Sequence, residues 1–250
     1  MTDPYVKQII ENEVAYIEFY HPTHNSLPGN ILLELVEVIT NAGENDQIKV
    51  IVLKSGGDRT FCAGASFKEL ININDQATGK VFFSGFANVI NAMRTCPKFI
   101  IGRIQGKTVG GGVGLAASTD YCMATKYASI KLSELNIGIG PFVVGPAIER
   151  KIGLSAMSQI AIDAATFYTA SWAKQQGLFT HVFENTAELD VAVKATAEHL
   201  CTYNLNAMKE MKKVFWKGTE DWNTLLAERA EISGRLVLSE VTKEKLKDFK

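Results

Sequence analysis

One acidic residue and two glycine-bearing loops carry the residue types in this sequence that are best suited to chemistry. Glu134 lies among apolar residues in the segment 132–138, residues 110–112 are three consecutive glycines, and Gly64 lies in a second loop. Glycine lets the backbone approach a ligand closely and present its N–H groups. If the two loops meet, they form an oxyanion hole worth about 3 to 4 kcal/mol per donor. Glu134 would then be the base that forms an enolate from a thioester.

Two other interpretations fit the same glycines. Gly112, Gly114 and Ala117 match the G-x-G-x-x-A pattern of dinucleotide-binding folds, in which an acid follows about 20 residues later. Here the apolar segment 121–124 intervenes before Glu134. Alternatively, the glycines serve tight packing and Glu134 is a solvated loop acid, which is the usual position of a glutamate. A nicotinamide-binding oxidoreductase therefore stays open as an alternative function.

The elements that would position these residues alternate between strands and helices. Apolar and β-branched runs predict strands at residues 14–20, 50–53, 99–104 and 178–183. Helical periodicity and caps predict helices from residue 27 to Gly43, at about 79–93, at 146–152, at 155–165 and from Thr169 or Ser171 to Gly177. Beyond this point the chain shows helical periodicity alone. The pattern predicts an α/β core followed by a helical region.

The composition indicates a soluble globular protein with a large core. The 250 residues are 46% hydrophobic and 21% charged, and the net charge of −1 gives no general reason to expect nucleic acid or an anionic membrane as a partner. The four cysteines form no C-x-x-C pair, so neither a disulfide nor a zinc framework is expected. With no signal segment and no apolar run of about 20 residues, we expect a cytoplasmic protein without membrane contact.

Five segments in the same order resemble the crotonase superfamily, the enoyl-CoA hydratase/isomerase family, over nearly the whole chain. Residues 61–68 are similar to its F-x-A-G-x-D-x-K loop, and residues 104–120 to its N-G-x-x-x-G-G-G-x-E-L-x-x-x-C-D motif. Residues 132–138 are similar to its x-P-E-x-x-x-G motif, and residues 170–178 to its A-x-x-A-x-x-x-G-L-V motif. Residues 243–249 are similar to the family tail that carries lysine and phenylalanine. Together they are more specific than any single glycine motif.

The resemblance implies an architecture and an assembly. The family fold is an α/β crotonase-like spiral of β-β-α turns, expected here at residues 1–185. A C-terminal helical trimerisation region is expected at residues 186–250. A homotrimer or a dimer of trimers is expected, with an acyl-CoA thioester as substrate. Coenzyme A is then part of the substrate, and no further cofactor or metal is implied.

The same resemblance assigns roles to individual residues. The N–H groups of Ala65 and Gly111 would form the oxyanion hole, and Glu134 would be the acid/base. The substrate-binding positions are Ala63, Ser66, Phe67, Lys68, Gly110, Gly114 and Phe142, of which the first four would follow the adenine and pantetheine path. From their spacing, we expect apolar side chains to surround the acyl chain and to raise the basicity of Glu134 by desolvation. These residues are Phe61, Phe82, Phe86, Ile139 and Phe142. Asp120 is predicted to be structural, at a helix end or a strand start.

Two positions depart from the family pattern. Gly114 stands where many family hydratases carry the first of two glutamates, and Ser66 replaces the usual aspartate. Family isomerases use one carboxylate, which takes a proton from C2 and returns one to C4. Some members assigned as hydratases of branched or glutaconyl-type substrates also read G-G-G-V-G-L. The sequence therefore predicts hydration or double-bond isomerisation of an enoyl-CoA with a single glutamate, and a catalytically silent CoA-binding relative is a further alternative.

Overall fold

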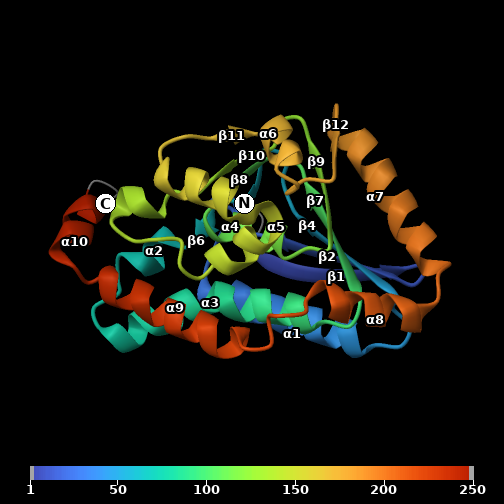
Figure 1. Cartoon of the computed structure of the whole chain (residues 1–250), viewed down its shortest axis with the longest axis horizontal. Coiled ribbons are helices and arrows are strands. Elements are labelled where there is room, and N and C mark those ends of the chain that lie inside the picture. The colour runs from blue at the N-terminus through green and yellow to red at the C-terminus, as the bar shows by residue number, and fades with distance from the viewer. Residues whose placement is uncertain (1–2, 248–250) are drawn as a thin grey trace.

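The computed structural model describes residues 3–247, and its largest element is a six-stranded sheet (Figure 1). The strand order is β1-β2-β4-β7-β9-β12, in which only β1 is antiparallel to its neighbour. Its strands are β1 (Tyr5–Glu11), β2 (Val14–Tyr20), β4 (Val50–Ser55), β7 (Phe99–Ile104), β9 (Tyr121–Thr125) and β12 (His181–Phe183). The parallel strands follow one another in chain order, without the reversal that creates a dinucleotide crevice. The topology therefore does not support the dinucleotide interpretation.

Short strands form two smaller sheets beside the large one. The four-stranded sheet has the order β11-β10-β8-β5, and a separate parallel pair joins β3 to β6. Their bounds are β3 (Ser26–Leu27), β5 (Thr60–Cys62), β6 (Gly64–Ala65), β8 (Lys107–Val109), β10 (Ser129–Lys131) and β11 (Tyr168–Thr169). These strands redirect the chain after each long strand.

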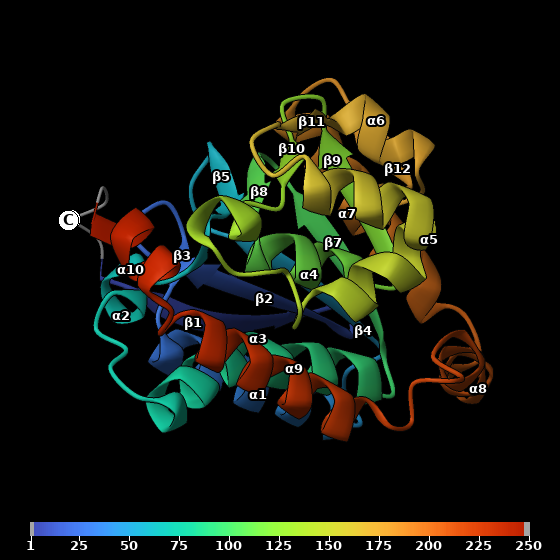
Figure 2. The same ribbon diagram turned by 60° about the vertical axis from the view of Figure 1, so that its left-hand side comes forward.

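The chain repeats one unit: a long strand, a short strand in a smaller sheet, and a helix. The unit recurs four times, with the short strands β3, β5, β8 and β10. The four helices that complete the units are α1 (Gly29–Glu44), α3 (Gln76–Thr95), α4 (Gly111–Ala117) and α5 (Gly145–Ile162). The predicted spiral of β-β-α turns is confirmed. Its repetition places α4 in the middle of the molecule (Figure 2).

The two faces of the large sheet bury different side chains, because side chains alternate along a strand. Val14, Val50 and Val52 pack on helix α7 (Thr186–Cys201), whereas Ala15 and Ile51 join the main core with α1. Burying one such aliphatic side chain stabilises the fold by about 1.5–3 kcal/mol. The sheet is therefore covered on both sides, as its continuous apolar strands require.

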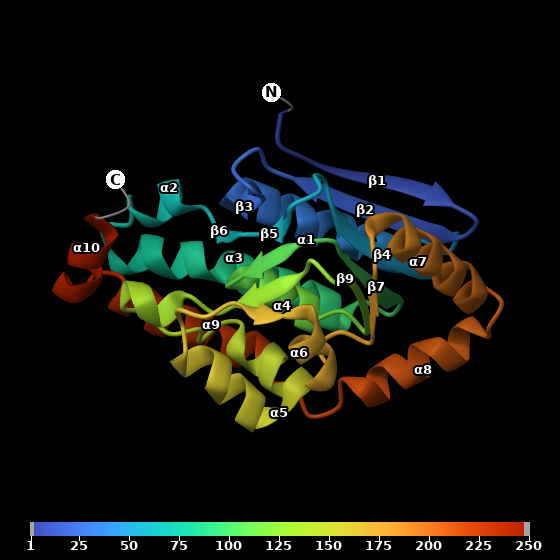
Figure 3. The same cartoon turned by 90° about the horizontal axis from the view of Figure 1, so that it is seen from above.

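The last part of the chain is helical. After α7 come α8 (Leu205–Phe215), α9 (Trp222–Leu236) and α10 (Glu240–Lys247). Helix α9 crosses α3 where Gly79 meets Gly234, and α10 lies beside the short helix α2 (Phe67–Leu70), as Figure 3 shows. The predicted boundary at 185/186 and the trimerisation role of this region stay predictions. Phe249 of the predicted tail lies outside the described residues.

Several predicted ends of strands and helices agree with the structure, and others differ for identifiable physical reasons. The strands at 14–20 and 99–104 have the predicted bounds. Helix α3 is longer than predicted because Asp75 and Thr78 form a capping box, and Gly153 interrupts α5 with a φ of +79°. Helix α6 (Ala170–Gln175) is capped by Thr169, one of the two predicted caps, rather than by Ser171. No helix in the described range 3–247 is long and apolar enough to cross a bilayer.

Candidate active site

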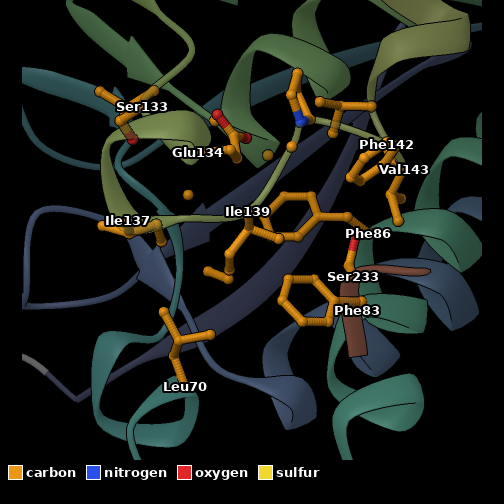
Figure 4. Close-up of a pocket in the computed structure, with 18 of the residues that line it drawn as sticks. Leu70, Phe83, Phe86, Ser133, Glu134, Ile137, Ile139, Phe142, Val143 and Ser233 are labelled. Atoms are coloured by element: carbon orange, nitrogen blue, oxygen red, sulfur yellow. The ribbon is translucent and has the colours of Figure 1, made fainter. Parts of the chain in front are cut away.

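A cavity of about 100 Å³ lies where the two glycine-bearing loops meet. Figure 4 shows Glu134 on one side of this pocket and Leu70 on the opposite side, with Ile139 between them and the rings of Phe83 and Phe86 beside it. Most of the lining is apolar. Glu134 is the one ionisable side chain among the described residues that line the pocket. Any charge-based chemistry in the cavity therefore depends on this group.

The two loops lie side by side at Gly64 and Gly111. A Cβ atom built on Gly64 would be 3.7 Å from the Gly111 nitrogen. Ser66 donates its N–H to Leu27 O at 2.9 Å in the pair between β3 and β6. N–H groups alternate in direction along a strand, so the Ala65 N–H points away from β3. Both Ala65 and Gly111 line the pocket.

Gly111 begins helix α4, and Gly110 turns the chain into it. The first N–H groups of a helix have no partner within the helix, and the helix dipole favours negative charge there. Gly110 has a φ of +52°, which only glycine adopts without strain, and a Cβ there would be 3.0 Å from Glu134 Oε1. The glycine thus brings the helix N-terminus and the Glu134 carboxyl group together.

Glu134 begins the 3₁₀ helix η1 (Glu134–Ile137), and it lines the pocket. Its Oε2 atom is buried and accepts no hydrogen bond from the residues that the structure describes. Burial raises the pKa of Glu134 from 4.5 to about 7, opposed by the backbone N–H groups of Glu134 and Ser133. At neutral pH the group therefore exists in both protonation states, which suits proton transfer in either direction.

The wall at Gly114 is closed by aliphatic side chains. A Cβ atom on Gly114 would be 2.6 Å from Val144 Cγ1 and 3.4 Å from Ile90 Cδ1. Ile90 is fully buried and Val144 nearly so. A second carboxylate at position 114 therefore has no space in this packing.

A family model described as enoyl-CoA hydratase/isomerase matches residues 9–248 of the chain. The chain belongs to the enoyl-CoA hydratase/isomerase family. This family member is an enzyme that acts on CoA thioesters. Its crotonase fold agrees with a crystal structure of enoyl-CoA hydratase from Bacillus halodurans at a TM-score of 0.90, with 23% identity and coverage of 98% of this chain and 99% of that one.

Relatives with different reactions are similar to this enoyl-CoA hydratase/isomerase family member. The peroxisomal Delta(3,5)-Delta(2,4)-dienoyl-CoA isomerase of Arabidopsis thaliana is 27% identical over 231 residues, which are 86% of this chain and 81% of the relative. The mitochondrial methylglutaconyl-CoA hydratase of Mus musculus is 31% identical over 171 residues, which are 68% of this chain and 54% of the relative. The matched region is thus about half the length of that hydratase.

The structure brings together only some of the substrate-binding residues predicted from the family pattern. Four of the predicted positions line the pocket, namely Ala63, Phe67, Gly110 and Phe142. Ser66 instead caps α2, because its side chain accepts a hydrogen bond from Glu69 N at 3.3 Å. Lys68 is exposed and outside the lining, and Gly114 lies behind Val144. The replacement of the family aspartate at Ser66 thus leaves a helix cap in this loop.

The structure also places Phe61, the glycines at 111 and 112, and Asp120. Phe61 does not line the pocket, since its ring packs edge-on against Phe19 in the main core. Gly111 and Gly112 do not form a turn but lie in α4, where their missing side chains leave room for Phe86 and Cys62. Asp120 is a buried structural residue at the start of β9, as predicted.

Sequence reasoning missed the contribution of α9. Ser233 lines the pocket from the C-terminal region, together with Phe83 from α3 and Val144 from the start of α5. Helical periodicity alone identifies Phe83 as an apolar position. The sequence contains no signal that places Ser233 beside the glycine loops, because that contact depends on how α9 crosses α3.

Proposed function

We propose that this enzyme shifts the double bond of a 3-enoyl-CoA to the 2 position. The observation that carries the proposal is the single buried carboxyl group, Glu134, in a pocket whose other described lining residues are uncharged. The thioester carbonyl oxygen accepts hydrogen bonds from the N–H groups of Ala65 and Gly111. Each such donor lowers the barrier by about 3 kcal/mol.

The reaction is a proton transfer between two carbon atoms. The Glu134 carboxylate removes a proton from C2, and the electron pair moves into the thioester to form an enolate that the oxyanion hole stabilises. The protonated Glu134 then returns a proton to C4 while the double bond forms between C2 and C3. Nothing is added or lost, and Glu134 ends as the carboxylate. A pKa of about 7 supports both steps because neither protonation state is strongly favoured.

The apolar wall favours isomerisation over hydration. Addition of water requires a polar group that holds and orients the water as it attacks C3. At position 114, the aliphatic side chains of Val144 and Ile90 occupy the space that a second carboxylate needs. The remaining side-chain hydroxyls in the described lining belong to Ser133 and Ser233.

The lining also supports an uncharged acyl group as the substrate class. A charged group buried without a partner costs several kcal/mol, and the described lining contains no cation. A methylglutaconyl group carries a free carboxylate, so a small apolar acyl chain fits this pocket better. Binding of butyryl-CoA and glutaryl-CoA, compared by calorimetry, tests this: we expect at least tenfold weaker binding of glutaryl-CoA, and equal affinities would contradict it.

Hydration of a 2-enoyl-CoA is the second candidate function. It is favoured by the unpartnered Glu134 Oε2, which has room to accept a hydrogen bond from a water molecule, and by the similarity to a methylglutaconyl-CoA hydratase. The carboxyl group would activate that water alone. This mechanism requires one of the two serine hydroxyls to act as the second water ligand.

The deciding experiment supplies 3-hexenoyl-CoA and 2-hexenoyl-CoA separately and identifies the products by chromatography with mass detection. Conversion of the 3-enoyl to the 2-enoyl thioester without a change of mass supports isomerisation. Gain of the mass of one water on the 2-enoyl thioester alone contradicts it and supports hydration. No product from either thioester, despite tight binding of CoA, would identify a catalytically silent relative.

We also propose a homotrimer or a dimer of trimers, assembled through residues 186–250. The proposal rests on the family resemblance and on the helical character of this region. Sedimentation velocity gives the mass of the assembly directly, and a monomer would contradict it. A cytoplasmic location, predicted from the sequence, stays a prediction.

A further inference from the structure

Helix α10, at the C-terminal end of the described chain, is in direct contact with the segment that carries Glu134. Thr242 on this helix is fully buried, and its Oγ1 donates a hydrogen bond to Gly138 O at 3.1 Å. The Ser239 hydroxyl donates to Thr242 Oγ1 at 3.0 Å. The threonine hydroxyl therefore accepts one hydrogen bond and donates another, which fixes its orientation.

Gly138 ends the short helix that begins with Glu134. It has a φ of +83°, and its N–H bonds to Leu135 O at 3.1 Å, while Ile139 N bonds to Glu134 O at 3.0 Å. A Cβ atom on Gly138 would be 2.5 Å from Thr242 Oγ1, so the approach of α10 requires glycine here. The bond from Thr242 thus reaches the end of a turn whose first residue carries the carboxyl group.

A small apolar cluster lies beside the hydrogen bond between Thr242 and Gly138, and it includes a residue of α2. Leu246 and Val237 pack with Ile139 and Leu70 in a cluster separate from the main core. Ile139 follows the Glu134 turn, and Leu70 ends α2, the helix that begins two residues after Ala65. Leu246 of α10 and Val237, which follows α9, therefore share one cluster with the segment bearing the acid and with the end of α2, which follows the oxyanion-hole loop.

We propose that Thr242 is a positioning residue, whose hydrogen bond to Gly138 holds the Glu134 carboxyl group over the pocket. The inference rests on the proposed proton transfer by Glu134, but it holds for isomerisation and hydration alike. Nothing in the Thr242 side chain reaches the described pocket lining, so it acts through the backbone of the turn. A displacement of about 1 Å at a reacting group can reduce the rate about a hundredfold.

The test measures exchange of the C2 protons of butyryl-CoA in D₂O by mass spectrometry, because this reports enolate formation without a double bond. Thr242→Val keeps the shape of the side chain and removes the hydroxyl. We expect its exchange rate at saturating butyryl-CoA to fall at least tenfold, while its Kd for butyryl-CoA, measured by calorimetry, changes less than twofold. Thr242→Ser keeps the hydroxyl and should recover most of the rate.

Val241→Ala, on the exposed side of the same helix, is the matched control and should exchange at the wild-type rate. Should Thr242→Val prove unfolded, Ser239→Ala at a partly exposed position removes the donor that orients the Thr242 hydroxyl, together with the acceptor of the Thr242 N–H, and should show a smaller loss in the same direction. Wild-type exchange by Thr242→Val, or equal losses in rate and in affinity, would overturn the positioning role. Absence of exchange in the wild-type enzyme would instead overturn the proposed function, and this inference with it.

Discussion

Two buried carboxyl groups in this enzyme have opposite surroundings. Asp120 accepts hydrogen bonds from Ile100 N at 2.7 Å, Trp216 Nε1 at 3.0 Å and Lys212 Nζ at 2.8 Å. Asp120 and Lys212 form an ion pair, and their side chains are only 5% and 3% exposed, respectively. The Oε2 atom of Glu134 is also buried but accepts no hydrogen bond from the described residues. One carboxylate is satisfied by its neighbours, and the other is left available to a substrate.

The comparison of Asp120 with Glu134 shows that burial of a carboxyl group can have two different effects. Around Asp120, three donors from β7, from α8 and from the residue that follows α8 join the C-terminal region to the large sheet, so the charge is compensated where it is buried. Around Glu134, desolvation outweighs the opposing backbone N–H groups of Glu134 and Ser133, which raises the pKa of the carboxyl group to about 7. The first arrangement stabilises the fold, and the second reduces stability while it supplies a base.

The largest expected effect is on catalysis at Glu134. Glu134→Gln keeps the size of the side chain but cannot accept a proton from C2. We expect the exchange of butyryl-CoA C2 protons to fall by about 10³-fold or more, with little change in butyryl-CoA binding. A variant that exchanges at the normal rate would exclude Glu134 as the base and remove the contrast with Asp120.

The next effect is on stability at Asp120. Asp120→Asn leaves the buried Lys212 ammonium group without its anion, and breaking such a pair costs about 3–5 kcal/mol. Urea unfolding should show this loss in the free energy of unfolding. Glu210→Gln is the control, because its pair with Lys213 is about 70% exposed and contributes at most about 1 kcal/mol. Similar losses in both variants would mean that burial is not what distinguishes Asp120.

The pH dependence of stability should report the burial of the Glu134 carboxyl group. The pKa of Glu134 is raised from 4.5 to about 7, so its ionisation favours the unfolded state: its stabilising contribution is complete below pH 4.5 and is lost as the pH rises through 7. The difference is about 3 kcal/mol at about 1.4 kcal/mol per pKa unit. Glu134→Gln should therefore match the wild type at pH 4 and exceed its unfolding free energy by about 3 kcal/mol at pH 8.

Urea titrations of both proteins at the two pH values measure this difference. The exchange rate of the wild type gives an independent check, because only the carboxylate form removes a proton. It should rise with pH through a midpoint near 7. A midpoint near 4.5 would show that the carboxyl group is solvated in solution.

The smallest expected effect concerns the wall at Gly114. The methyl group of Gly114→Ala would lie 2.6 Å from Val144 Cγ1, and such overpacking costs about 1–3 kcal/mol of unfolding free energy. Val144→Ala in the same chain should relieve part of this cost, since it removes the clashing methyl groups. If Gly114→Ala were neutral, the wall would have room for a second polar group, and the packing at position 114 would no longer disfavour hydration.

Much of the fold was predictable because it depends on local patterns. The strands at 14–20 and 99–104, the cap at Thr169 and the break at Gly153 follow from β-branched runs, capping residues and glycine. The short strand β6 gave no such signal, because a two-residue strand is defined by its partner rather than by its own sequence. The family resemblance, carried by several motifs in order, supplied the spiral that connects these elements.

The candidate site was predictable in its chemistry but not in its boundaries. Glu134 among apolar neighbours and the glycines of both loops are properties of the sequence itself, and the structure brings them to one pocket. The family resemblance assigned Ser66 to the site, and spacing assigned Phe61 to it. A helix cap and an aromatic contact hold their side chains elsewhere.

The sequence by itself thus determined the kinds of groups available: one carboxyl group among apolar residues, two glycine-bearing segments that can present N–H groups, and no glutamate at position 114. Only the tertiary structure decided that Glu134 Oε2 is buried without a hydrogen-bond partner among residues 3–247, and that Val144 occupies the space beside Gly114. It also decided that Thr242 donates a hydrogen bond to the carbonyl of Gly138, 104 residues away. The physical reason is that burial and side-chain contacts depend on which distant segments pack together. Residue type and spacing record the local preference of each segment, not its neighbours in space.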